Sequence, residues 1–152
     1  MLISVAVIGA GLAATGEVWS HVQQREREAE LLFAGNQFRQ AIGYYYESTP
    51  GGGKRYPERL EELVEDHRFP TPKRHLRKLY ADPLTGTPEW GLMEAPGGGI
   101  MGVYSLSQAA PVKRAKFRAR DRTFQEAAGY YEWRFFYEPP LAVGEVEMGN
   151  GK

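Results

Sequence analysis

The first 47 residues constrain the fold of this chain more than any other stretch. Met1–Gly16 carries no charged side chain, whereas Glu17–Glu47 is polar, keeps a helical repeat and contains no proline. We therefore predict one continuous helix, apolar at its start and amphipathic afterwards, about 70 Å long at ~1.5 Å per residue. The rest of the chain is too small to cover such a helix along its whole length. Part of the helix must be buried in a membrane, in other copies of the chain, or in both.

The composition suits one domain with an appendage and disfavours most kinds of active site. The 152 residues have a net charge of zero and include no cysteine, which excludes disulfides, thiolate nucleophiles and cysteine-ligated metals. The three histidines, His21, His67 and His75, lie far apart in the sequence, so a histidine-rich metal site is not expected. No serine sits in a nucleophile-elbow pattern. We expect a protein that is not an enzyme and holds no cofactor or metal.

The polar part of the expected helix divides into two sections. The segment Arg25–Glu30 alternates in charge, which is typical of a solvated face. Beyond it, apolar residues recur at intervals of three and four and predict a stripe that packs on the rest of the chain: Leu31, Gly35, Phe38, Ile42 and Tyr45. We therefore expect residues 1–30 to protrude, residues 31–138 to form a globular head, and residues 139–152 to form a flexible tail.

The remaining chain alternates short apolar segments with turns. Proline, glycine and aspartate punctuate it, and Ala95–Gly99 has the composition of a hairpin loop. We predict a short helix over Glu58–Glu65 and a helical turn over Lys73–Tyr80, with Leu76 and Leu79 facing inward. Three strands are expected, over Glu89–Glu94, Ile100–Leu106 and Tyr130–Tyr137. The predicted fold class is α+β, with the long N-terminal helix packed on a small three-stranded antiparallel sheet.

The start of the chain also fits a dinucleotide-binding fingerprint. Val5–Ala14 reads as strand-GxGxxA-helix, with Gly9 and Gly11 in the glycine positions. That fingerprint requires a second strand ending in an acid about 20 residues later. The corresponding segment, Gln23–Glu30, is polar and helical instead. The small residues are better explained by close packing between helices.

A strongly basic stretch precedes the third expected strand. Lys113–Arg122 contains six basic residues, which could bind nucleic acid or acidic lipid. The alternative is a solvated loop that leads into a helix at Thr123–Gly129. Both interpretations remain open from the sequence.

Three motifs in order resemble the pseudopilins of bacterial type II secretion. Arg55-Tyr56-Pro57 with Leu60 and Leu63-Val64 resembles their YP-x-x-L-x-x-L element. Tyr80–Gly86 followed by Trp90 is similar to their DP-x-TG…W element, and Gly99–Ser107 is similar to the strand motif that comes next. The chain thus resembles the type IV pilin-like family over residues 1–138, with these motif residues: Tyr56, Pro57, Asp82, Pro83, Gly86 and Trp90.

The resemblance implies a structural subunit of a pseudopilus or pilus. Such a subunit is a single-pass protein of the bacterial inner membrane, with its head in the periplasm, and polymerises with other pilin-like subunits through its N-terminal helix. The residues expected to enter the membrane and the filament core are Leu2, Ile3, Val5, Val7, Ile8 and Leu12. An alternative within the same architecture is a DNA-uptake pilin that binds nucleic acid through residues 113–122.

Two features of the family pattern are missing from this sequence. The prepilin cleavage motif is absent, and Glu17 comes too late to be the acid that the family carries near its mature N-terminus, so we expect the natural start to lie upstream of Met1. The calcium site of the major pseudopilins is not expected either. Residues 106–130 offer only Asp121 and Glu126 as carboxylates, fewer oxygen ligands than calcium requires.

Overall fold

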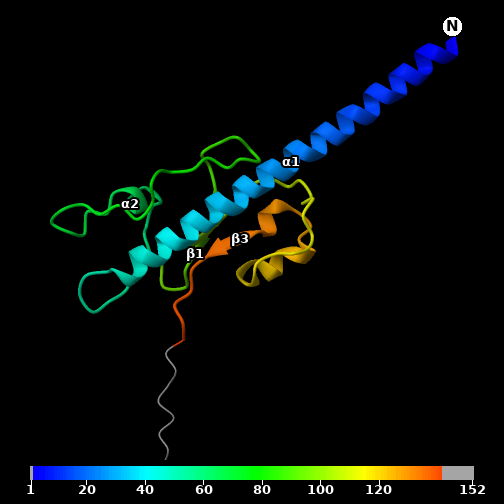
Figure 1. Cartoon of the computed structure of the whole chain (residues 1–152). Helices are drawn as coiled ribbons and strands as arrows, with labels where there is room; N and C mark the ends of the chain where they lie inside the picture. Colours follow the sequence, from blue (N-terminus) through cyan, green and yellow to red (C-terminus); the bar gives the residue numbers. More distant parts are fainter. Residues whose placement is uncertain (1, 142–152) are drawn as a thin grey trace, which may run out of the picture.

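The computed structural model of the chain describes residues 2–141, and the side chains of residues 19–141. The dominant element is a single helix, α1, which runs from Leu2 to Glu47 and confirms the prediction of one uninterrupted helix. Its C-terminal half lies against the rest of the chain, while its N-terminal half extends beyond the head (Figure 1). Among the described residues no helix is both long and apolar enough to cross a membrane. Side chains of the stretch Met1–Gly16, including the residues expected to enter the membrane, lie outside that set.

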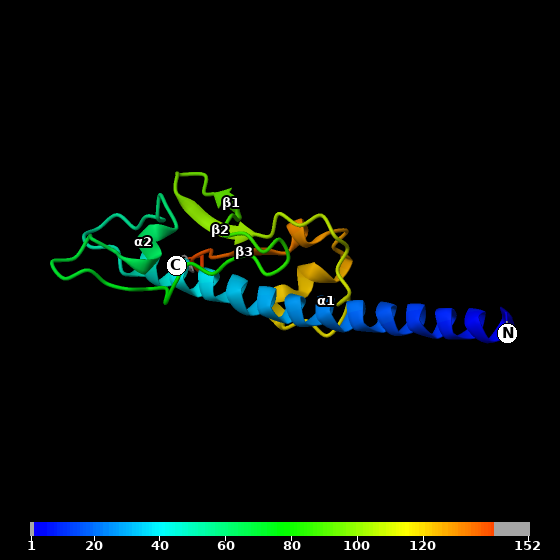
Figure 2. The same cartoon turned by 90° about the horizontal axis from the view of Figure 1, so that it is seen from above.

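A small antiparallel sheet packs on α1. Its strands are β1 (Gly91–Glu94), β2 (Ile100–Tyr104) and β3 (Arg134–Phe136), in the order β1-β2-β3, so the central strand is β2. Leu92 pairs with Val103, and Val103 pairs with Phe135. Both β2 and β3 contact α1, and the sheet lies along one side of the helix (Figure 2). The α+β class and the antiparallel three-stranded sheet are therefore as predicted.

The core forms where the predicted α1 stripe meets the sheet. Leu31, Phe38 and Ile42 have no exposed surface, and Tyr45 is 2% exposed, so the stripe is confirmed. Phe38 meets Trp90 edge to face, with ring centroids 5.1 Å apart. On the other side of the core, Trp133 stacks on Phe124 at 5.4 Å. Gly35 completes the stripe because the Phe135 ring occupies the space where a side chain at residue 35 would lie.

Several short elements differ from the sequence prediction. The third strand is limited to β3, because Tyr130–Glu132 forms a 3-10 turn, η2, that turns Tyr130 and Trp133 into the core. The short helix α2 covers only Glu61–Val64. No helical turn forms over residues 73–80: the backbone N–H groups of His75 and Leu76 donate to the Leu63 carbonyl instead.

Two further predictions of local structure are corrected. Leu76 is buried as expected, but Leu79 is 40% exposed and does not face inward. The helix expected at residues 123–129 begins earlier and is a kinked 3-10 element, η1, over Ala119–Glu126. Residues 139–141 have no regular structure, and the remainder of the expected tail lies outside the described residues.

Candidate functional site

The residues of the pseudopilin-like motifs hold separate segments of the head together. The Tyr56 hydroxyl donates to the Tyr137 carbonyl at 2.9 Å, and the Pro57 carbonyl accepts the Ile100 N–H at 2.7 Å. These bonds attach the loop after α1 to the start of β2 and the end of β3. The indole N–H of Trp90 donates to the Tyr80 carbonyl at 2.8 Å. The motif residues therefore connect separate segments of the chain and do not converge on a cavity.

Asp82 is completely buried, and it stabilises both the turn in which it lies and a contact with a distant segment. It accepts the Leu84 N–H at 2.9 Å, and its carbonyl accepts the Gly86 N–H at 2.8 Å, where Gly86 adopts the positive φ of 73°. This confirms the turn expected from the sequence. Its second carboxylate oxygen accepts the Ser105 hydroxyl at 2.6 Å, which attaches the turn to the chain just after β2.

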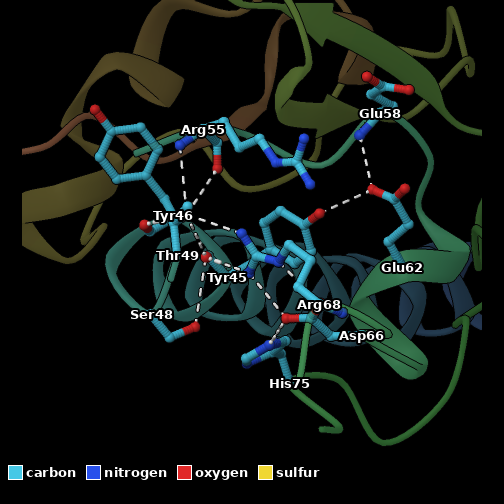
Figure 3. A network of polar contacts seen from close by, with 10 residues as sticks. All are labelled: Tyr45, Tyr46, Ser48, Thr49, Arg55, Glu58, Glu62, Asp66, Arg68 and His75. Carbon is cyan, nitrogen blue, oxygen red and sulfur yellow. Dashed lines mark hydrogen bonds and ion pairs between the residues drawn. The ribbon is translucent and has the colours of Figure 1, made fainter. Parts of the chain in front are cut away.

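A buried polar cluster closes the C-terminal end of α1 (Figure 3). The guanidinium of Arg68 lies flat on Tyr45, 3.5 Å from its ring centroid, and donates to the Tyr45 carbonyl and the Thr49 hydroxyl at 2.8 Å each. The final carbonyls of a helix lack partners within it, and a cation there also complements the helix dipole. Arg68 therefore caps α1 from a loop that follows it by about 20 residues. No sequence pattern predicted this contact.

Asp66 holds Arg68 in place. Its two carboxylate oxygens accept Nε and Nη2 of Arg68 at 2.9 and 2.8 Å, and His75 Nε2 lies 2.8 Å from Oδ2. Burial alone would raise the pKa of Asp66, but the hydrogen bonds from Arg68 and His75 outweigh it and lower the pKa to about 2. Burial raises the pKa of the neighbouring Tyr45 hydroxyl to about 12, and its bond to Glu62 adds to the effect.

The role of this cluster is structural: it attaches the C-terminal end of α1 to the loop that carries Asp66 and Arg68, and we call it the clasp. An aspartate beside a histidine also occurs in hydrolase triads, where the histidine activates a hydroxyl. Here the Ser48 and Thr49 hydroxyls donate to the α1 carbonyls of residues 45 and 46, so they are already used in ending the helix. Within the described part of the chain, no group of three or more acidic or histidine side chains is arranged to hold a metal ion.

Another buried carboxylate, Glu28, joins the middle of α1 to the head. Glu28 is 2% exposed, and it accepts the backbone N–H groups of Val112 and Lys113 together with the Tyr130 hydroxyl. Burial and the bond to Glu28 both raise the pKa of Tyr130. The expectation that Arg25–Glu30 is wholly solvated is therefore wrong at Glu28. Gln24 also contacts the head through the Ala110 carbonyl at 3.0 Å, so contacts begin before residue 31.

The outward side of α1 carries large apolar side chains that the head leaves largely exposed, although the Phe33 ring meets Tyr80 edge to face at 5.8 Å. Trp19 is 65% exposed, Val22 46%, Phe33 56% and Tyr44 62%. Val22, Phe33 and Tyr44 recur every eleven residues, which is about three turns, so they fall on one face of the helix. Trp19 lies one turn from Val22 on that face. These exposed apolar side chains on one helix face make it the candidate contact surface of α1. We call this row the outward stripe.

The basic stretch 113–122 is mostly exposed and lies beside α1. Arg114, Lys116, Arg118 and Arg122 form no ion pair with any residue that the structure describes. Asp121 is the exception in this segment: it is buried and accepts Nη2 of Arg39 on α1 at 2.9 Å. The stretch is thus anchored at both ends, by Glu28 and by Arg39, and presents its cations to solvent.

The fingerprint at residues 9–14 lies inside α1. The strand and the turn that a dinucleotide site needs are absent there, because residues 2–47 are helical without a break. Comparisons of the chain with protein-family models, curated proteins and solved structures found no match.

Proposed function

We propose that this chain is a structural, pilin-like subunit that assembles through its N-terminal helix into a pseudopilus or pilus of a bacterial secretion machine. The observation that carries the proposal is the two-sided use of α1. One face, with Leu31, Phe38 and Ile42, is completely buried under the head, and the outward stripe stays uncovered. The helix also extends beyond the head (Figure 1). Both features are those of a subunit whose helix packs against a partner outside this chain.

The mechanism is helix-on-helix packing. The uncharged stretch Met1–Gly16 would hold the subunit in the inner membrane before assembly, with the head in the periplasm, and would then enter the filament core. Its small residues, such as Gly9 and Gly11, permit close approach of neighbouring helices. The head would set the contacts between subunits. The order of the motif residues, from Tyr56-Pro57 through Asp82-Pro83 to Trp90, supports the same family of subunits.

A charge in the apolar stretch tests this function. Ile8→Lys should abolish both membrane retention and assembly, because a cation near the bilayer centre is strongly disfavoured. Thr71→Lys is the matched control, since it adds the same charge at an exposed position of the head, outside that stretch. The readouts are fractionation of membranes and recovery of sheared filaments. Normal fractionation and assembly of the Ile8→Lys chain would refute the proposal.

A DNA-uptake pilin is the second candidate, and the exposed cations of residues 113–122 favour it, since Arg118 and Arg122 form no ion pair with any residue that the structure describes. Reversing the charge of Arg118, Arg120 and Arg122 together should then weaken DNA binding and reduce its dependence on salt concentration. Fluorescence anisotropy with a labelled duplex at 20 and 200 mM salt measures both quantities. Absence of DNA binding by the unmodified chain at low salt would exclude this candidate.

A further inference from the structure

A groove runs along α1 beside the basic stretch. One part, of about 300 Å³, lies between Ala29, Phe33 and Asn36 of α1 and the opposing residues Lys113 and Arg118. A second part, of about 380 Å³, shares Asn36 and Arg120 with the first and continues to Tyr44 and Tyr137. Together they form one channel along the helix from Ala29 to Glu47.

The groove is positively charged. Lys113, Arg118 and Arg120 line it, and the one acid of its first part, Asp121, is already held by Arg39 at 2.9 Å and faces Arg120 at 3.6 Å. Nη1 of Arg39 is buried and has no hydrogen-bond partner within the described chain. Cations in a concave surface reinforce one another's potential. The groove therefore favours an acidic occupant.

The groove also has apolar walls. Phe33 is 56% exposed at its edge, and Phe117 lines it, packed edge to face on Phe124 and Trp133 inside the head. An occupant that fits both properties carries acidic groups alternating with large apolar groups. A nucleic-acid duplex satisfies only the charge, because its bases are stacked inside and its backbone phosphates offer nothing to the aromatic edge.

Such a surface exists on α1 itself. Glu26 and Glu30 are exposed, form no ion pair with any described residue, and share the face of Trp19 and Val22. At 100° per residue these four side chains lie in one strip along the surface of the helix. We propose that this segment of one copy, Trp19–Glu30, docks in the groove of a second copy, with Glu26 and Glu30 opposite Arg118 and Arg120.

This inference rests on the proposed function and specifies its subunit contact. The docked segment and the groove are different surfaces of the same chain, so the contact is head-to-tail, and it stays open when each copy is shifted along the axis relative to the last. The groove lies further along α1 than the segment by roughly ten residues, which shifts each copy by about 15 Å along the helix axis. Repetition of the contact gives an open filament.

Reciprocal charge reversal tests the pairing in the full-length chain in detergent micelles. Arg118→Glu with Arg120→Glu should weaken self-association by about tenfold to a hundredfold, because two attractive contacts become repulsive. Glu26→Lys with Glu30→Lys should have the same effect. Mixing the two variants, or combining all four changes in one chain, should restore association. Sedimentation velocity at 50 and 500 mM NaCl measures the association and its expected weakening by salt.

The matched control reverses two other cations of the same stretch. Arg114→Glu with Arg122→Glu changes the net charge equally, and both residues are exposed and do not line the groove. Association should stay within about twofold of the unmodified chain. Far-ultraviolet circular dichroism confirms that each variant keeps its helix content.

A direct proximity measurement is possible because the chain has no cysteine. A Glu30→Cys chain mixed with an Arg118→Cys chain should form mixed disulfide dimers in excess over either homodimer. Failure of the reciprocal variants to restore association, or an equal loss in the control pair, overturns the docking while leaving assembly through residues 1–16 intact. Absence of self-association in the unmodified chain overturns both the docking and the proposed function.

Discussion

Replacement of Asp66 by asparagine removes the acceptor that orders the clasp at the end of α1. Asp66 and Arg68 have side chains only 1% and 9% exposed, so the pair is shielded from solvent. The folded-state pKa is about 2, against about 3.9 for an unfolded aspartate, a difference that corresponds to roughly 2.5 kcal/mol of stability at neutral pH. Since the folded-state pKa is the lower one, this stability is complete above about pH 5 and is lost as pH falls toward 2.

The variant should therefore be less stable by about 2.5 kcal/mol at pH 7 and by much less at pH 2.5. Urea unfolding of the full-length chain gives both values from the fluorescence of Trp90 and Trp133, which are buried in the head. The difference between variant and unmodified chain isolates Asp66 from the other carboxylates that protonate in acid. Glu65→Gln is the control, because that side chain is 65% exposed, and should cost less than about 0.5 kcal/mol. A stability difference independent of pH, or one below about 1 kcal/mol at pH 7, would refute the reasoning.

Three further substitutions follow from the packing of α1. Phe38→Ala should cost about 3–5 kcal/mol in urea unfolding, since its side chain is fully buried against Trp90, and a cost near 1 kcal/mol would contradict that packing. Gly35→Ala should destabilise the head by about 1–3 kcal/mol although alanine favours helix, because its Cβ would meet the Phe135 ring; a gain in stability would show that the ring moves freely. Glu28→Gln should cost about 1–3 kcal/mol and accelerate hydrogen exchange at the Val112 and Lys113 amides, since one carbonyl oxygen replaces two acceptors; unchanged exchange would argue against the anchor.

The parts of the fold that follow from local pattern were predictable. The spacing of Leu31, Phe38, Ile42 and Tyr45 fixes one face of a helix, and the glycine-rich segment 95–99 sets a hairpin. Residues such as Glu28 and Arg68 were not predictable because their roles depend on partners 84 and 23 residues away. Glu28 sits in a run of alternating charge that by itself indicates solvent exposure. Leu79 is the opposite case. Its apolar side chain indicates burial, but burial depends on a covering segment that the local pattern does not reveal, and the side chain is 40% exposed.

The third strand begins later than predicted for a related reason. An aromatic run such as Tyr130–Tyr137 has high strand propensity, but Gly129 and the 3-10 turn that follows it rotate Tyr130 and Trp133 toward α1. Tertiary packing therefore determined the local structure there. The groove beside residues 113–121 was likewise invisible, because it joins two segments that the sequence places about 80 residues apart. Only the basic character of residues 113–122, which form one wall of the groove, was predictable from the sequence.

The contact between Gln24 and Tyr130 spans 106 positions of the chain and has a consequence for the order of folding. The head covers one face of α1 with residues from the last elements of the chain, and Tyr130, Trp133 and Phe135 complete the burial of that face. Contacts of such large sequence separation form slowly, because a long loop must close before they become favourable. Until those elements pack, the face of α1 that carries Leu31, Phe38 and Ile42 is therefore open. The head reaches its final form only after β3 has emerged.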